Sequence, residues 1–420
     1  MEKNKFPKPC VEGRIPILDG LRGIAVLAVM HYHFMLNGVQ HENAFWDRVY
    51  VHVVGIGWAG VDLFFVLSGF LITGILYDSR HEQHYYRVFY ARRTVRIFPL
   101  YYASLAIIFP LVHLVANSSP AADGGNAHAA QVWAWVYVIN WRIGLLGWGS
   151  ISPMLQHFWS LSVEEQFYLF WPIMVRTFPR RRLIGTCRVM VVAALGLRFA
   201  FVKYLHGSAA AYVLTFSRMD ALAIGSLVAL LAREMPDWDV LVKWSKPVMS
   251  LAAAGILMIA WRAGTTENST YWMSTVGLGL TAIFFGGCLV WAIRSEASNF
   301  ARRVVSSGTL RFFGKYSYGL YICHQPVLLV LTGLGVTSVY LAPFFHNRAL
   351  AILAFHLAAL TISVFISILV WHLFEKHFLK LKHLAVFRYK RDDSRQSPAI
   401  DRSDRKLLFG KPIAEGESGI

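Results

Sequence analysis

The chain has 420 residues, of which 56% are hydrophobic and only 15% are charged, and its formal charge at neutral pH is +17. A soluble domain carries about 25% charged residues, so this composition excludes a soluble globular protein. Lys and Arg cluster just outside the apolar runs, a distribution that follows the positive-inside rule and argues against a nucleic-acid-binding surface. We therefore predict an all-α, polytopic helix bundle embedded in a lipid bilayer.

Ten apolar segments approach the ~20 residues that cross a bilayer. Their approximate limits are 18–36, 53–77, 97–116, 160–178, 185–205, 213–232, 247–263, 272–293, 316–337 and 349–373. An eleventh stretch, near 131–147, is expected to lie in the membrane interface or to re-enter, because a further crossing would place the later basic loops on the opposite side. With ten spans, most Lys and Arg fall on one side, and both termini are predicted to be cytoplasmic.

The domain organisation follows from these limits. Residues 1–16 form a cytoplasmic tail, 17–378 the membrane domain, and 379–420 a basic cytoplasmic tail that is expected to be disordered because it lacks an apolar period. We expect the first span to remain uncleaved, since Arg22 and His33 interrupt it and no small-residue cleavage site follows. The four cysteines are too far apart to predict a disulfide framework or a zinc site, and no metal is expected.

Two ionisable residues, Arg22 and His33, lie within the first span. Eleven residues apart, they are separated by roughly 16 Å along a helix and about 20° around it. Such groups are costly in lipid and usually serve function. A neutral imidazole can act as a general base, and a guanidinium can bind phosphate bidentately. The alternative is that His33 only hydrogen-bonds a neighbouring helix.

Three further arginines precede the third span. Arg93 and Arg96 share a helix face because they are three residues apart, and Arg92 is adjacent. We interpret them as a site for a polyphosphate ligand. The alternative is ordinary positive-inside flanking of the span.

The start of the fourth span carries two carboxylates with different expected roles. Ser162 and Glu165 match a capping box, S-x-x-E, which gives Glu165 a structural role. Glu164, Tyr168 and Pro172 recur every four residues and therefore line one face of a helix. A carboxylate on that face could orient a histidine or bind a sugar hydroxyl.

Four more polar residues fall within apolar segments. Asp62 begins the run of the second span, and Arg218 and Asp220 lie early in the sixth. Mutual ion pairing is the simplest interpretation of these three, although groups in a bilayer are seldom idle. His324 in the ninth span is interpreted as a packing hydrogen-bond partner.

These segments together resemble acyltransferase family 3 of integral membrane proteins. The matching motifs are R-x10-H at Arg22 and His33, GVDLFFVLSGF, R-x-x-R at Arg93 and Arg96, W-x-L-x-x-E-x-x-x-Y-x-x-x-P from Trp159, SRMDALAIG and YGLYICHQP. They occur in the family's order over residues 15–378. The sequence departs from the family pattern at Gln156, where glycine is frequent, and around Ile322 and Cys323, where an aromatic residue is usual.

The resemblance implies a bacterial inner-membrane O-acyltransferase that acetylates a cell-surface glycan or related glycosylated acceptor. Acetyl-CoA or a similar acyl-CoA is the implied co-substrate, with no permanently bound cofactor. Some members carry a fused extracytoplasmic hydrolase-like domain, for which we expect no room after the tenth span. The implied catalytic residues are His33, Glu164 and Asp62; the donor-binding residues are Arg22, Arg93 and Arg96; supporting residues are Trp159, Tyr168, Arg218, Asp220 and His324.

Two other classes of protein remain as alternatives. A transporter or flippase would use intramembrane His, Arg and Asp as a proton or substrate pathway, but no internal repeat is visible in the sequence. A haem protein would use His113, His356 or His372 as axial ligands. The sequence does not assign the acceptor, the acyl length or the oligomeric state.

Overall fold

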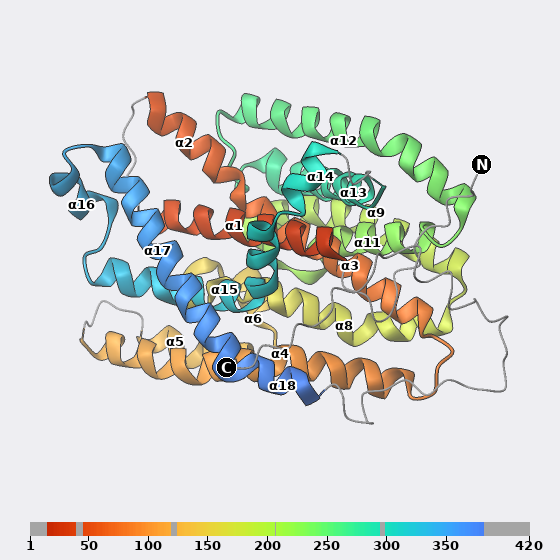
Figure 1. The fold of residues 1–420 in the computed structure, drawn as a ribbon, viewed down its shortest axis with the longest axis horizontal. Helices are drawn as coiled ribbons and strands as arrows, with labels where there is room; N and C mark the ends of the chain where they lie inside the picture. Colours follow the sequence, from red (N-terminus) through yellow and green to blue (C-terminus); the bar gives the residue numbers. More distant parts are fainter. Residues whose placement is uncertain (1–14, 39–44, 119–123, 206, 295–298, 382–420) are drawn as a thin grey trace, which may run out of the picture.

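The computed structural model describes residues 15–38, 45–118, 124–205, 207–294 and 299–381, and all regular elements in these ranges are helices (Figure 1). In chain order they are α1 (Pro16–Gly38), α2 (Phe45–Gly55), η1 (Ile56–Ala59), α3 (Gly60–Asp78), α4 (Tyr85–Ser118), α5 (Gly124–Trp135), α6 (Ile139–Leu146), η2 (Trp148–Ser150), α7 (Pro153–Gln156), α8 (Trp159–Thr177), α9 (Arg180–Tyr204), α10 (Ser208–Val213), α11 (Thr215–Leu231), α12 (Met235–Ala263), η3 (Met273–Gly277), α13 (Leu278–Arg294), α14 (Phe300–Val305), α15 (Gly308–Gly333), α16 (Ser338–Phe345), α17 (Arg348–Val370), η4 (Trp371–Glu375) and α18 (Lys376–Lys380).

The described helices form an all-α, multi-pass membrane bundle. Seven of them are long and apolar enough to cross a bilayer, and α15 with α16 forms an eighth candidate that is bent by 60°. These eight correspond to eight of the ten expected spans. The other two, α1 and α8, have 23 and 19 residues but fall outside this composition test. Both carry ionisable residues on faces that other helices cover, so protein rather than lipid surrounds their polar groups.

The aromatic stretch near 131–147 is not a single spanning helix. It is divided between α5 and α6, which have 12 and 8 residues, and the break lies at Tyr137, whose φ is +56°. Helices of these lengths extend about 18 Å and 12 Å, well short of the ~30 Å hydrocarbon core. Tyr137 stacks on Tyr101 of α4 with ring centroids 3.9 Å apart, which holds the break against the bundle.

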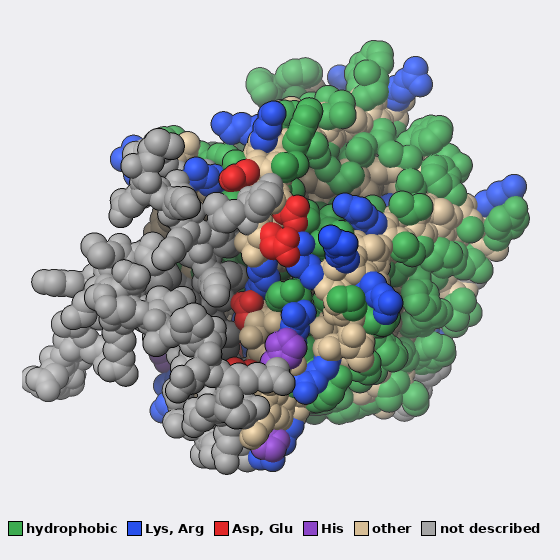
Figure 2. Space-filling model, turned by 90° about the vertical axis from the view of Figure 1, so that its right-hand side faces the viewer, with side chains coloured by type: hydrophobic (Ala, Val, Ile, Leu, Met, Phe, Trp, Pro, Cys, Tyr) green, Lys and Arg blue, Asp and Glu red, His purple; other side chains and the backbone are tan. Residues whose placement is uncertain are grey.

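One face of the bundle gathers the basic connections. Arg233, after α11, pairs with Asp78 at the end of α3 (2.8 Å). Arg180, at the start of α9, pairs with Glu234 (3.1 Å) and Asp237 (2.5 Å). Figure 2 shows Lys and Arg side chains spread over this end of the molecule. The common face agrees with the expected sorting of the basic loops. The tails 1–14 and 382–420 lie outside the described residues, so the cytoplasmic placement of both termini stays a prediction.

Glycines let two helix pairs approach closely. A Cβ atom at Gly69 of α3 would overlap the backbone of Leu222, and one at Gly225 of α11 would overlap the backbone of Val66. Gly23 of α1 and Gly314 of α15 form a second, similar contact. Small residues allow such backbone contact between membrane helices. The two contacts set the positions of α1, α3, α11 and α15, the helices that carry Arg22, Asp62, Arg218 and His324.

We predict that Gly225→Leu lowers the thermal unfolding temperature in detergent, because the new side chain must push α3 and α11 apart. Overpacking of this kind costs about 1–3 kcal/mol or more. Gly196→Leu on α9 is the matched control, since a Cβ atom there meets no neighbour. Equal melting temperatures for the two variants would contradict the close packing of α3 on α11.

Candidate functional site

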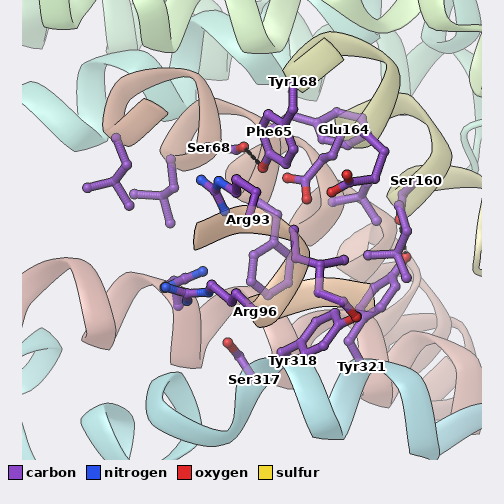
Figure 3. Close-up of a pocket in the computed structure, with 18 residues that line it drawn as sticks. Phe65, Ser68, Arg93, Arg96, Ser160, Glu164, Tyr168, Ser317, Tyr318 and Tyr321 are labelled. Carbon is purple, nitrogen blue, oxygen red and sulfur yellow. Dashed lines mark hydrogen bonds between the residues drawn. The ribbon is translucent and has the colours of Figure 1, made fainter. Parts of the chain in front are cut away.

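A pocket of about 90 Å³ lies between α1, α3, α4, α8 and α15 (Figure 3). Such a volume holds several water molecules. Its apolar wall comes mainly from α3 and includes Phe64 and Phe65. The polar side chains that line it are Arg22, Ser68, Arg93, Arg96, Ser160, Glu164, Glu165, Tyr168, Ser317, Tyr318 and Tyr321. The structure therefore brings together the three arginines that the sequence assigned to donor binding.

The arginines form one end of the pocket. Arg93 and Arg96 come from one face of α4, as their spacing predicted, and Arg22 comes from α1. Arg96 is exposed, and Arg22 and Arg93 are partly exposed, so solvent reaches their guanidinium groups. The Arg93 guanidinium also lies 4.4 Å from the ring centroid of Tyr168, in a cation–π contact. Arg92 does not line the pocket.

Two glutamates from α8 face these arginines. Glu164 lies beside the hydroxyls of Ser68 and Tyr168, which share a hydrogen bond, and Glu164 and Tyr168 line the pocket together as their spacing predicted (Figure 3). The capping box predicted at Ser162 is wrong. Helix α8 begins at Trp159, so Ser162 already lies within the helix and its hydroxyl donates to the Phe158 carbonyl (3.3 Å). Glu165 is therefore free of a capping role and lines the pocket.

The end of the pocket opposite the arginines is closed by Tyr321 and Ser160 (Figure 3). The Tyr321 hydroxyl donates to the His157 carbonyl (2.8 Å) and shares a hydrogen bond with the Ser160 hydroxyl. On its other side the Tyr321 ring contacts the rings of His157 and His324, with centroids 5.5 Å and 5.8 Å away. Tyr321 therefore stands between the pocket and a group of buried or partly buried histidines.

His33 of α1 belongs to that group. Its Nδ1 lies 2.9 Å from Nε2 of His324, and the His324 Nδ1 reaches the carbonyls of Leu320 (3.1 Å) and Tyr321 (2.8 Å). His157, in the connection between α7 and α8, packs against His324 with ring centroids 5.1 Å apart. Burial, together with His324 and His33, keeps the pKa of His157 well below its ordinary value, so this imidazole is neutral.

Asp62 lies in a different environment, because it forms a buried ion pair with Arg218 (2.5 Å) and accepts a hydrogen bond from Thr281 (3.1 Å). Asp220 forms a second buried pair with Arg198 (2.6 Å). The predicted mutual pairing is confirmed for Asp62 with Arg218, whereas Asp220 pairs with Arg198, which the sequence had not included. Asp62 is not among the residues that line the pocket, so the geometry gives it a place in the helix packing.

Aromatic rings enclose the Arg218 guanidinium. The centroids of Tyr212, Phe65 and Trp159 lie 5.0 Å, 5.6 Å and 5.7 Å from its central carbon. Arg218 is 0% exposed, so the rings and Asp62 replace the water that a surface guanidinium would have. Trp159, which was expected to support the site, therefore acts on this ion pair.

Several residues that shape the site were not found from the sequence. Tyr321, Ser160 and His157 gave no periodic signal, because their hydrogen bonds join the α7–α8 region to α15. Glu375, at the end of η4, interacts electrostatically with Arg96, and its carboxylate reaches the backbone of α15 at Gly319. A carboxylate at the end of the last apolar segment was the signal that could have revealed it.

The described residues contain no cluster of three His, Cys, Asp or Glu that could hold a metal ion. His356, one of the haem-ligand candidates, lies 2.8 Å from the Tyr50 hydroxyl through Nε2 and packs against His31. His372 is exposed at the bundle surface.

A multi-pass bundle of this kind can hold an anion at the arginines and move a proton or an acyl group at the histidines. These two capacities together are what a membrane-embedded transferase requires. The chain belongs to acyltransferase family 3, because the family model, described as an acyltransferase domain, matches residues 15–377.

Two curated relatives illustrate the similarity. The peptidoglycan O-acetyltransferase OatA of Listeria monocytogenes is 28% identical over 330 residues, which cover 76% of this chain and 50% of that protein. The O-acetyltransferase OatA of Staphylococcus aureus is 27% identical over 335 residues, which cover 75% of this chain and 51% of that protein. The chain thus spans about half the length of these relatives. No solved structure matches it.

We predict that Asp62→Leu and Arg218→Met each lower the unfolding temperature strongly, because either change leaves one buried charge without its partner. Breaking a buried pair costs about 3–5 kcal/mol, whereas replacing both members with apolar groups costs far less. The double variant is therefore expected to be more stable than either single variant in thermal unfolding. Glu234→Ala, at the 58% exposed partner of Arg180, is the control and should change little. Additive losses in the double variant would contradict the pairing.

Proposed function

We propose that this protein is an O-acetyltransferase of the bacterial inner membrane that transfers an acetyl group from acetyl-CoA to a hydroxyl of a cell-wall glycan such as peptidoglycan. The observation that carries the proposal is the pocket that runs from three arginines to Tyr321, with the His33–His324 pair directly behind it. The printed functions of the relatives support the glycan acceptor. The basic face of the bundle faces the cytoplasm in this proposal.

The donor binds with its phosphates at Arg22, Arg93 and Arg96. Guanidinium groups bind phosphate oxygens bidentately and keep their charge at every physiological pH. Glu164 and Glu165 hold the arginines in the pocket before the donor arrives, since both carboxylates line the same space. The pantetheine arm then extends along the apolar wall at Phe64 towards Tyr321.

Access to His33 requires Tyr321 to move. Its hydroxyl is held by the His157 carbonyl and the Ser160 hydroxyl, and its ring separates the pocket from the imidazoles. In this proposal the thioester reaches His33 after the Tyr321 side chain rotates away from Ser160. The closed position keeps the donor thioester from water until an acceptor is present.

His33 carries the transfer in one of two ways. As general base it takes the proton of the acceptor hydroxyl while the oxygen attacks the thioester carbonyl, the new C–O bond forms, and the C–S bond breaks to release CoA thiolate. As transient acyl carrier it is acylated first, CoA thiolate leaves, and the acceptor hydroxyl then displaces the imidazole. In both routes the thiolate finally takes the released proton.

We predict that His33→Ala abolishes most acetyl transfer in membranes containing acetyl-CoA and a glycan acceptor, because a positioned base contributes about 10²–10⁴-fold. His31→Ala is the matched control: it lies two residues away on α1 and contacts the Leu27 carbonyl and His356 instead of the pocket. Release of CoA and acetylation of the acceptor should fall together in the His33 variant. Wild-type activity of that variant, at equal expression, would refute the mechanism.

Arg93→Ala is expected to raise the KM for acetyl-CoA at least tenfold, because it removes a phosphate-binding group from the pocket. Arg92→Ala, at the adjacent residue that does not line the pocket, should leave the KM near the wild-type value. Acetyl-CoA titrations of both variants measure the difference. Equal KM values would remove the phosphate assignment, and complete absence of CoA release from the wild-type protein would favour a transporter.

A further inference from the structure

The hydrogen bonds of His324 bear on the protonation of two rings, its own and that of His33. This side chain is 0% exposed and lies on α15, whereas its partner His33 lies on α1. A neutral imidazole has one N–H donor and one nitrogen that accepts. The contacts of His324 therefore specify which nitrogen of each ring carries the proton.

The backbone of α15 determines which nitrogen of the His324 ring carries the proton. The His324 Nδ1 lies 2.8 Å from the Tyr321 carbonyl oxygen and 3.1 Å from that of Leu320. A carbonyl oxygen can only accept a hydrogen bond, so Nδ1 must carry the proton. The Nε2 of neutral His324 is then the nitrogen with the lone pair, and it can only accept.

The tautomer of His33 follows from that of His324. The His324 Nε2 lies 2.9 Å from the His33 Nδ1, and two lone pairs at that distance would repel. His33 must therefore donate from Nδ1, and in the neutral ring its Nε2 is the basic nitrogen. In many enzymes a carboxylate or carbonyl sets the tautomer of a histidine through its other ring nitrogen; here a second histidine does so.

We infer that His324 is a positioning residue that fixes His33 in the Nδ1–H tautomer, so that the His33 Nε2 is the atom that takes the proton or the acyl group. This inference rests on the proposed function for its catalytic consequence, but not for the tautomer itself.

The neighbourhood of His324 keeps that ring in one orientation. Pro326 lies in α15 and has no N–H, so the Ile322 carbonyl four residues earlier lacks its usual helical donor. That carbonyl faces the His157 ring, although without the geometry of a normal hydrogen bond. His157 is 3% exposed and packs against His324. The His324 ring is thus confined by its two carbonyls, by Tyr321 and by His157.

The arrangement also accommodates the charge that catalysis creates. When the His33 Nε2 takes the proton of the acceptor hydroxyl, the ring becomes an imidazolium whose Nδ1–H still donates to the His324 lone pair. No bond at Nδ1 has to break, and no group has to reorient. A hydrogen bond to a charged donor is roughly twice as strong as one between neutral groups, so the contact with His324 strengthens as His33 becomes charged.

The tautomer can be measured directly in the full-length protein. Histidine labelled with ¹³C and ¹⁵N, observed by solid-state NMR in lipid bilayers, distinguishes Nδ1–H from Nε2–H rings, and the His33 signal is assigned by its loss in His33→Asn. We expect His33 to be Nδ1-protonated in the wild type at neutral pH. His324→Phe removes the acceptor and should return His33 to the Nε2–H form. A wild-type His33 protonated at Nε2, or an unchanged Nδ1–H form in His324→Phe, would overturn the inference.

Two further variants separate positioning from folding. The Gln side chain in His324→Gln places a carbonyl oxygen near the former Nε2, so it should preserve the Nδ1–H form of His33 and retain at least tenfold more acetyl transfer than His324→Phe. His356→Phe removes another buried histidine, which contacts Tyr50, and should change neither the tautomer nor kcat. Equal activity of His324→Gln and His324→Phe, with both folded, would contradict a positioning role.

The same experiments distinguish a failure of the proposed function from a failure of the tautomer assignment. If His33→Ala retained acetyl transfer while NMR showed the Nδ1–H form of His33 and its dependence on His324, the catalytic role of His33 would fall and the tautomer assignment would stand. If His33→Ala were inactive but wild-type His33 were protonated at Nε2, the proposed function would stand and the role of His324 would fall.

Discussion

The structure depends on one constraint: the acids of two buried ion pairs, and the imidazole of His33, find their partners on other helices of an apolar bundle. Asp62 of α3 binds Arg218 of α11, and Asp220 of the same helix binds Arg198 of α9. His33 of α1 likewise binds His324 of α15. Because a charge left alone in such surroundings is very costly, these contacts leave few alternatives for the relative positions of the helices. Glycine contacts bring the backbones close together in two of the pairs, α3 with α11 and α1 with α15.

The same constraint separates two groups of polar residues with different tasks. The ion pairs of Asp62 with Arg218 and of Asp220 with Arg198 are 0–1% exposed, aromatic rings enclose Arg218, and none of the four residues lines the pocket. The arginines of the pocket remain partly exposed and can therefore exchange water for a ligand. Between the pocket and the histidines, Tyr321 supplies both a wall and a hydrogen bond. A donor with an anionic head and a narrow reactive end suits this order of groups.

Some predictions depended on local spacing and others on partners that spacing does not reveal. The shared face of Arg93 and Arg96, and that of Glu164 and Tyr168, follow from helical periodicity alone, and the structure has both. The capping box at Ser162 failed because α8 begins three residues earlier, after the short turn at His157. The membership of Arg198 in the ion-pair network, and of Glu375 beside Arg96, was hidden because each partner lies far away in the chain.

The sequence by itself determined that this is a multi-pass helical membrane protein, that its basic loops gather on one face, and that Arg22 and His33 share one helix, because hydropathy, charge and helical period are local properties. Only the tertiary structure decided that Asp62 pairs with Arg218 and that His33 meets His324. The physical reason is that a hydrogen bond or ion pair between helices depends on their crossing and rotation. Those are set by packing over the whole bundle, including the glycine contacts at Gly69 and Gly314.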